Sequence, residues 1–202
     1  MLLLSSSDRF MLAADAVRHT CSGDVARIAA ELSPGYASSL AKKNPGSADE
    51  SVCAALLLLD MLAVRGFSPS QVLRGENGKP RFASGGPEFS LSHDGGAVIC
   101  AISDSPVGVD VMALSGRPGR DRQAAVAARF FTPEESGRVS GAASREEQDA
   151  VFAGIWTSRE AAAKRAGGVL GDYLVRPLPV DAEFFRFEFR LAGKRYAAAV
   201  CL

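Results

Sequence analysis

The chain of 202 residues is long enough for one domain or two small lobes, and its 47% hydrophobic residues can supply a buried core. Its 23 basic and 23 acidic residues balance, which excludes the strong overall positive field that is typical of nucleic-acid-binding proteins. We therefore expect no nucleic-acid partner. Any site for an anionic ligand must be built locally.

The cysteines and the apolar runs indicate a reduced, cytoplasmic protein. The four cysteines lack the CxxC spacing of zinc sites, and we interpret them as free thiols. The apolar start, Met1 to Leu4, stops at Ser5 and is too short for a signal peptide. The apolar run from Val52 to Val64 is interrupted by Asp60, so it falls short of a membrane span. We expect no association with a membrane.

The first half is predicted to contain a strand, several helices and a hairpin. A short strand is predicted at Leu2 to Leu4, and helices at 8–19 and 24–32. The segment Ser47-Ala48-Asp49-Glu50 resembles a capping box, which predicts a helix from Ser47 to Val64 that ends at Gly66.

After this helix the sequence pattern changes from helices to strands. Ser68-Pro69 is typical of a helix start and predicts a short turn that reaches about Leu73. Residues 76–80 are rich in turn formers. Alternation then predicts strands at Phe89–His93, Ala97–Ile102 and Val107–Val111.

The second half repeats this order of elements. Helices are predicted at 121–131 and at 146–166, and Thr132 is a capping residue that predicts the start of another helix between them. Strands are predicted at 183–191 and 196–202. Helices followed by a terminal hairpin thus occur twice. We predict an α+β fold of two similar, pseudo-duplicated lobes, residues 1–104 and 105–202, each with helices packed on a small antiparallel sheet.

Asp110 is the first candidate for chemistry. It lies in Gly108-Val109-Asp110-Val111, where alternation places both valines on one face of the strand and the carboxylate on the other. Burying an unpaired carboxylate would cost several kcal/mol, so a metal ion, an arginine or backbone N–H groups should meet it. The pattern alone is equally compatible with a structural ion pair.

The longest predicted helix carries a second candidate group. Trp156, Glu160 and Lys164 recur every four residues and so share one helix face. An ordinary solvent-exposed Glu–Lys pair is one interpretation, and would contribute only ~0.3 kcal/mol. The single tryptophan on this face and the alanines at 161–163, which allow another element to approach closely, favour a site instead.

His93 and Lys79 are weaker candidates. His93 ends a predicted strand beside the hydroxyl of Ser92, where an imidazole could donate to a phosphate. Lys79 stands in a turn between Gly78 and Pro80. Taken singly, each is compatible with an ordinary polar residue.

Taken in order, these motifs resemble the 4′-phosphopantetheinyl transferase superfamily, and the chain length resembles its two-lobed surfactin-activator type. The similarity covers about residues 76–170. The motifs that carry it are Gly78-Lys79-Pro80, the run from Phe89 to Gly95, Gly108-Val109-Asp110-Val111, Arg129-Phe130-Phe131 and the run from Trp156 to Lys164.

The resemblance implies a Mg²⁺-dependent transfer of the phosphopantetheine group of coenzyme A to a serine of an apo acyl or peptidyl carrier protein, with 3′,5′-ADP as the second product. Such carriers serve fatty-acid, polyketide or nonribosomal peptide synthesis. It also implies a monomer in which the two lobes form a pseudo-dimer, with the ligand cleft between them.

The resemblance further implies roles for individual residues. Asp110 and Glu160 would hold Mg²⁺, and Glu160 would also take the proton of the serine. Lys164 and His93 would contact the phosphates of coenzyme A. Lys79 and Ser92 would line the nucleotide. Glu135 falls where some relatives have an acid near the metal.

The sequence departs from the family pattern in the metal site and in the amino-terminal lobe. Met112 stands two residues after Asp110, on the same strand face, where many two-lobed relatives have a second acid. The basic residues that relatives carry for the 3′-phosphate are replaced at best by Lys42 and Lys43. Gly168 comes one place earlier than the second glycine of the family's usual turn. These departures favour an alternative, a non-catalytic member that still binds coenzyme A or a nucleotide.

Overall fold

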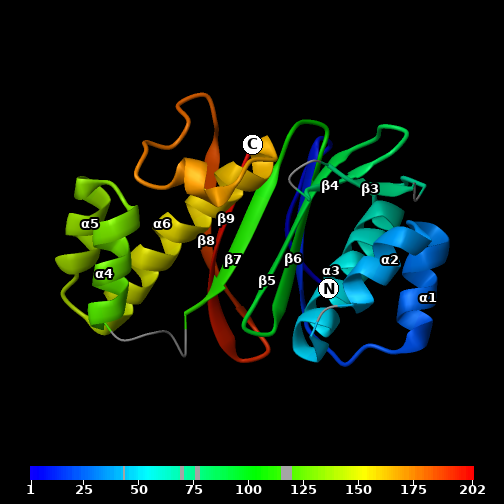
Figure 1. Ribbon diagram of the computed structural model, residues 1–202, viewed down its shortest axis with the longest axis horizontal. Coiled ribbons are helices and arrows are strands. Elements are labelled where there is room, and N and C mark those ends of the chain that lie inside the picture. The colour runs from blue at the N-terminus through cyan, green and yellow to red at the C-terminus, as the bar shows by residue number, and fades with distance from the viewer. Residues whose placement is uncertain (43, 69–70, 76–77, 115–119) are drawn as a thin grey trace.

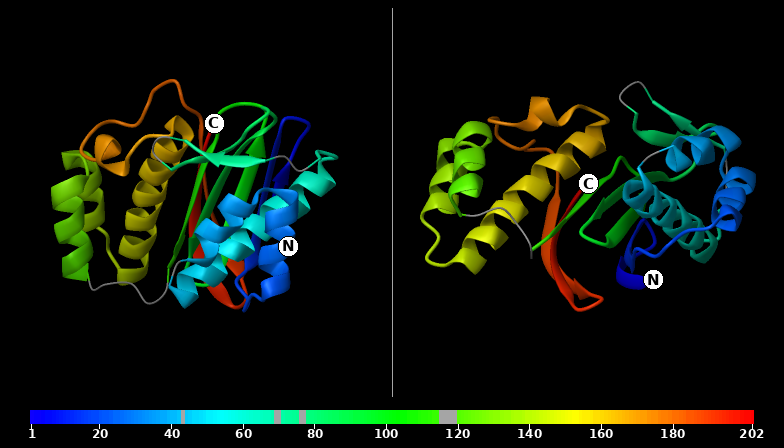
Figure 2. Two further views of the ribbon diagram at one scale, coloured as in Figure 1. Left: turned by 45° about the vertical axis from the view of Figure 1, so that its right-hand side comes forward. Right: turned by 60° about the horizontal axis from the view of Figure 1, so that its bottom comes forward.

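Two antiparallel sheets lie in the middle of the molecule, between two groups of helices (Figure 1). The computed structural model describes residues 1–42, 44–68, 71–75, 78–114 and 120–202. Helix α3 packs on the outer face of one sheet, with α1 and α2 against it, and α6 packs on the outer face of the other, with α4 and α5 against it; the right-hand view of Figure 2 separates the two groups. This mixed α+β architecture was predicted from the sequence.

The first sheet has the strand order β1-β2-β6-β5, and its three helices precede its last two strands. A small β3–β4 hairpin lies beside it. The bounds are β1 Leu2–Ser6, β2 Phe10–Ala16, α1 Ser22–Glu31, α2 Pro34–Ala41, α3 Pro45–Val64, β3 Val72–Arg74, β4 Pro80–Phe82, β5 Glu88–Asp94 and β6 Ala97–Ser103.

The second sheet has the strand order β7-β9-β8. Its bounds are β7 Gly108–Ala113, α4 Arg120–Phe130, α5 Pro133–Ser140, α6 Arg145–Ala166, the 3₁₀ helix η1 Leu170–Tyr173, β8 Phe184–Leu191 and β9 Lys194–Cys201. The strands and helices predicted for this half are therefore present, with ends that differ by only a few residues.

The two halves share an order of elements. β2, α1–α3, β5 and β6 correspond to β7, α4–α6, β8 and β9, and the sheet orders β2-β6-β5 and β7-β9-β8 match in the same way. The chain passes from one sheet to the other between Ser103 and Gly108. This shared order favours the proposed duplication.

The sheets close against each other along the edge strands β5 and β7. Leu12 and Ile99 of the first sheet join Val109 and Val111 of the second in one buried apolar layer. At the edge itself, the Ser90 hydroxyl accepts a hydrogen bond of 3.0 Å from the Val109 amide. β5 therefore satisfies a backbone donor on β7 with a side chain, and this contact holds the two sheets in register.

The helix predicted at 8–19 is wrong, because Phe10–Ala16 forms strand β2. β2 pairs with β1 on one side and β6 on the other, so it is a central strand. Met11 faces α3 and Leu12 faces the second sheet, and both are buried. A strand that is buried on both faces reads as a continuous apolar run, which has no period to distinguish it from a helix.

Two further expectations for the first half need correction. Helix α3 begins at Pro45 after Asn44, not at Ser47, and the Glu50 carboxylate pairs with His93 instead of closing a capping box. Residues 69 and 70 of the predicted turn lie outside the described part of the chain, but Val72–Arg74 is strand β3, so no helical turn reaches Leu73. Residues 76 and 77 of the predicted loop also lie outside the described part.

The described helices include none with the length and hydropathy needed to cross a membrane. α3 is apolar because its buried residues pack on the first sheet: Leu58 and Met61 are fully buried there.

We expect the four cysteines to differ sharply in their reaction with iodoacetamide. Cys21 is exposed, whereas Cys53, Cys100 and Cys201 are buried free thiols. Burial raises the pKa of all three, and that of Cys201 to about 11, so little thiolate forms near neutral pH. Mass spectrometry of the native protein should find label on Cys21 alone, and label on all four after unfolding. Fast native labelling of Cys100 would contradict the buried core.

Candidate active site

The candidate site forms where β5, β7 and α6 meet. β7 presents Asp110 and α6 presents Glu160 and Lys164, while β5 contributes Ser92. Asp110 lies on the strand face opposite Val109 and Val111, as alternation predicts, because the two valines are buried between the sheets. The carboxylate therefore faces α6 at the closed edge of the two sheets.

Lys164, Asp110 and Ser92 form a closed triangle of hydrogen bonds. The Lys164 ammonium donates to Asp110 Oδ1 over 2.7 Å and to Ser92 Oγ over 2.9 Å. Ser92 in turn donates to Asp110 Oδ1 over 2.6 Å. The Asp110 side chain is 9% exposed, so its charge is compensated by both groups from separate elements.

Glu160 lies beside this triangle without joining it. Within the described residues its carboxylate has no hydrogen bond or ion pair. Burial raises the pKa of Glu160, the charge of Asp110 raises it further, and Lys164 partly opposes both effects. Two carboxylates thus lie beside the ammonium of Lys164, and the carboxylate of Glu160, unpaired within the described residues, is suited to a cation.

The close approach of α6 depends on Gly108. A methyl group there would lie 1.9 Å from the Ala161 carbonyl oxygen and 2.5 Å from the Arg165 amide nitrogen. Ala161 and Ala162 are buried on the strand side of the helix, as their small size predicted. Sequence reasoning did not single out Gly108; its position next to the Val109–Asp110 pair was the only signal.

Lys79 reaches from the first half of the chain to the end of α6. Its ammonium donates to the carbonyl oxygens of Val107 and Arg165, at 3.3 and 3.2 Å, and lies 3.7 Å from Glu88. Burial lowers the pKa of Lys79, and Glu88 partly opposes this. Lys79 and Lys164 line the same pocket of about 230 Å³, together with Gly167 and Gly168.

His93 lies at the end of β5 but on the other face of the strand from Ser92. Its Nδ1 is 2.9 Å from the Glu50 carboxylate of α3, and its side chain is 31% exposed. Strand alternation explains why Ser92 meets the Asp110 group and His93 does not. Lys42 is exposed after the end of α2, and Lys43 lies outside the described residues.

Met112 shares a strand face with Asp110, as predicted, but its surroundings are apolar. It is 7% exposed and packs in a cluster with Phe131, Phe152 and the partly buried Trp156. The face of α6 that carries Trp156, Glu160 and Lys164 therefore has an apolar end over Met112 and a polar end over Asp110.

Glu135 lies apart from this group. Its carboxylate accepts from the Thr132 amide, which closes a capping box for α5, and from the guanidinium of Arg159. Arg159 is fully buried on α6 and also donates to the backbone carbonyls of Tyr173 and Arg176. The structure thus uses Glu135 and Arg159 to fix the segment after α6.

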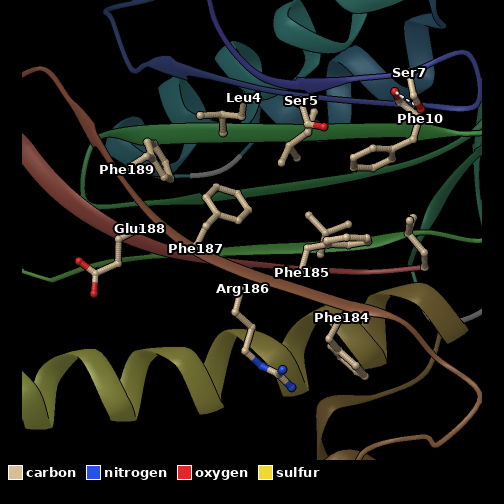
Figure 3. A pocket seen from close by; sticks show the side chains of 13 residues that line it. Leu4, Ser5, Ser7, Phe10, Phe184, Phe185, Arg186, Phe187, Glu188 and Phe189 are labelled. Atoms are coloured by element: carbon tan, nitrogen blue, oxygen red, sulfur yellow. Dashed lines mark hydrogen bonds between the residues drawn. The ribbon is translucent and has the colours of Figure 1, made fainter.

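A larger cavity of about 780 Å³ opens at the opposite edge of the two sheets, between β1 and β8. In Figure 3, Phe185 and Phe187 of β8 point toward Leu4 and Phe10, whereas Arg186 points away toward α6. The sheets therefore close at β5 and β7 and separate at β1 and β8. None of the candidate site residues within the described chain lines this cavity.

Comparison with known proteins assigns the family of this domain. Residues 106–201 match the model of the 4′-phosphopantetheinyl transferase superfamily. The matched segment contains β7 and α6, and so includes Asp110, Glu160 and Lys164. Residues 106–201 therefore form a domain of this superfamily, which confirms the resemblance found in the sequence.

Individual relatives carry the same name. The chain is 38% identical over 111 residues to the 4′-phosphopantetheinyl transferase AcpT of Salmonella typhimurium. This alignment covers 54% of this chain and 56% of that protein. The chain is also 31% identical over 126 residues to a 4′-phosphopantetheinyl transferase of Bacillus subtilis. That alignment covers 61% of this chain and 51% of that protein. The chain spans about half the length of the curated relatives it matches.

We expect Gly108→Ala to misplace α6 and to weaken the site. Because the new methyl group would meet helix backbone, the helix must move, at a cost of about 1–3 kcal/mol. The midpoint of thermal unfolding should fall. Gly35→Ala is the matched control, since nothing lies within 4 Å of a methyl group there. Unchanged stability of Gly108→Ala would show that β7 and α6 are not in such close contact.

Proposed function

We propose that this protein transfers the 4′-phosphopantetheine group of coenzyme A to a serine of an apo acyl or peptidyl carrier protein and releases 3′,5′-ADP. The observation that carries the proposal is the grouping of Asp110, Glu160 and Lys164 within the residues that match the superfamily. The proposal also includes a cytoplasmic location and a monomer whose two halves, residues 1–104 and 105–202, enclose the ligand.

The donor set fits Mg²⁺. Asp110 and Glu160 supply the hard carboxylate oxygens that this ion prefers, and Glu160 has no partner within the described chain. The described residues include no group of three or more acidic, histidine or cysteine side chains that could hold a metal. We therefore propose that the two carboxylates bind the ion together with oxygens of the diphosphate. When bound, the ion would offset the negative charge of the diphosphate.

The residues of the chain divide the remaining tasks. The Lys164 ammonium donates to a phosphate oxygen, as it does to Asp110 in the free protein, and stabilises charge on the transferred group. The Glu160 carboxylate accepts the proton of the carrier serine, directly or through water. The serine oxygen then bonds to the β-phosphorus of coenzyme A, and the bond from that phosphorus to the bridging oxygen breaks. The bridging oxygen leaves with its electron pair as part of 3′,5′-ADP.

The other candidate residues are assigned to binding. We propose that His93 contacts a phosphate of coenzyme A, that Lys79 and Ser92 line the nucleotide, and that Lys42 and Lys43 serve the 3′-phosphate. The pocket lined by Lys79, Lys164 and Gly168 supports a ligand that joins the two halves of the chain.

A second candidate function is that of a non-catalytic protein that binds coenzyme A. The packing of Met112 among aromatic side chains favours it, because no third carboxylate meets the cation there. To separate the two functions, the protein is incubated with coenzyme A, Mg²⁺ and several apo carrier proteins, and the carriers are weighed by mass spectrometry. A mass increase of one phosphopantetheine supports the enzyme. Binding of coenzyme A without any mass increase supports the alternative.

We expect Asp110→Asn to abolish transfer while the protein still folds. The amide keeps the shape of the side chain and can still accept from Ser92, but it removes the negative charge that faces the cation. Loss of transfer should exceed about a hundredfold, as for other residues that act on developing charge. Carrier mass measures transfer, and thermal unfolding checks the fold.

Asp60→Asn is the matched control for this prediction, because Asp60 is exposed on α3 and pairs with Arg27. It should transfer at the rate of the unaltered protein. If Asp110→Asn retained its rate per folded molecule, Asp110 would be the structural ion pair that the sequence left open.

A further inference from the structure

Both histidines of the chain are held by acids that follow each other on α3. The chain has two histidines. His19 Nδ1 lies 3.1 Å from Asp49 Oδ2, and His93 Nδ1 lies 2.9 Å from Glu50 Oε2. Neighbouring acids on one turn of α3 thus form two carboxylate–imidazole pairs. Both pairs use Nδ1 of the histidine, but they lie at different positions in the fold.

The two pairs differ in their surroundings. The His19 side chain is fully exposed, and Asp49 also accepts from the amide and the hydroxyl of Thr20. That pair anchors the segment before α1 to the start of α3. The His93 and Glu50 side chains are 31% and 25% exposed, and His93 follows Ser92, which belongs to the Asp110 triangle. The second pair therefore joins α3 to the strand that carries part of the site.

A carboxylate at Nδ1 determines what the imidazole can do at Nε2. Glu50 requires a proton on Nδ1, because a carboxylate can only accept. A neutral ring held in this way leaves Nε2 as an acceptor, which cannot donate to a phosphate oxygen. When the ring carries both protons, Nδ1 donates to Glu50 and Nε2 is a donor as well.

We propose that Glu50 is a positioning residue for His93: it fixes the ring with Nδ1 toward α3, so that Nε2 of the doubly protonated ring can donate to a phosphate of coenzyme A. This rests on the proposed function, which assigns the phosphate contact to His93, and it adds a residue of α3 to that site. Glu50 itself does not touch the ligand. The strand face of His93, turned away from Asp110, explains why its partner comes from α3.

The test compares Glu50→Gln with Asp49→Asn, which breaks the neighbouring pair and is the matched control. Glu50→Gln should weaken the binding of coenzyme A, measured by titration calorimetry, by roughly five- to tenfold, the loss expected for one hydrogen bond of ordinary strength. In the transfer assay the KM for coenzyme A should rise by a similar factor while kcat changes little. Asp49→Asn should bind coenzyme A as the unaltered protein does.

Imidazole nitrogen NMR gives a readout that does not depend on activity. With two histidines in the chain, the signals can be assigned from His19→Gln and His93→Gln variants. Glu50→Gln should shift the His93 signals away from the Nδ1-protonated pattern and leave those of His19 in place. Asp49→Asn should do the reverse.

A double-mutant cycle separates a positioning role from a merely structural one. If Glu50 acts through His93, Glu50→Gln should weaken coenzyme A binding no further in a His93→Gln background. Equal losses in both backgrounds, or unchanged binding by Glu50→Gln, would overturn the inference. If the unaltered protein did not bind coenzyme A, the proposed function and the ligand assigned to His93 would both be wrong. The NMR signals would still decide whether Glu50 fixes the orientation of the His93 ring.

Discussion

The contact of β7 with α6 at Gly108 is the constraint on which the site depends. Only a residue without a side chain lets the helix backbone lie so close to the strand. Asp110 lies two residues further along the strand. At this separation the Lys164 ammonium reaches the Asp110 carboxylate, and Glu160 lies beside it. A larger residue at position 108 would move Glu160 and Lys164 of α6 away from Asp110.

The charges at this contact are balanced by groups from both halves of the chain. Lys164 and Ser92 compensate Asp110, and Lys79, from the first half, donates to the Arg165 carbonyl near the end of α6. A lysine at the carboxyl end of a helix is favoured by the helix dipole, so Lys79 stabilises both the helix and the junction of the halves. Ligand phosphates would compete for the same two ammonium groups. Under the proposed function, a diphosphate would replace hydrogen bonds that hold the site together in its absence.

The sequence predicted elements with a clear period and missed those whose surroundings override it. The alternation of 183–191 and the cap at Thr132 mark a strand and a helix that the structure contains. β2 was missed because a strand buried on both faces has no alternation. In the site, spacing placed Glu160 and Lys164 on one helix face and Asp110 on the right strand face. Glu50 could not be recognised, because its partner His93 is 43 residues away in sequence and a capping role explained it locally.

The position of Met112 shows how one interface serves both stability and chemistry. The β7–α6 contact is apolar where Met112, Phe152 and Trp156 meet, and polar where Asp110, Glu160 and Lys164 meet. The side chain of an acid at position 112 would lie among aromatic rings. Burying an unpaired carboxylate there would cost several kcal/mol of stability unless a cation compensated its charge. A thioether gains from burial there and is too soft a ligand for Mg²⁺. This chain therefore has apolar packing where a third carboxylate could stand. Under the proposed function, a cation bound by Asp110 and Glu160 would depend on oxygens of the phosphate ligand.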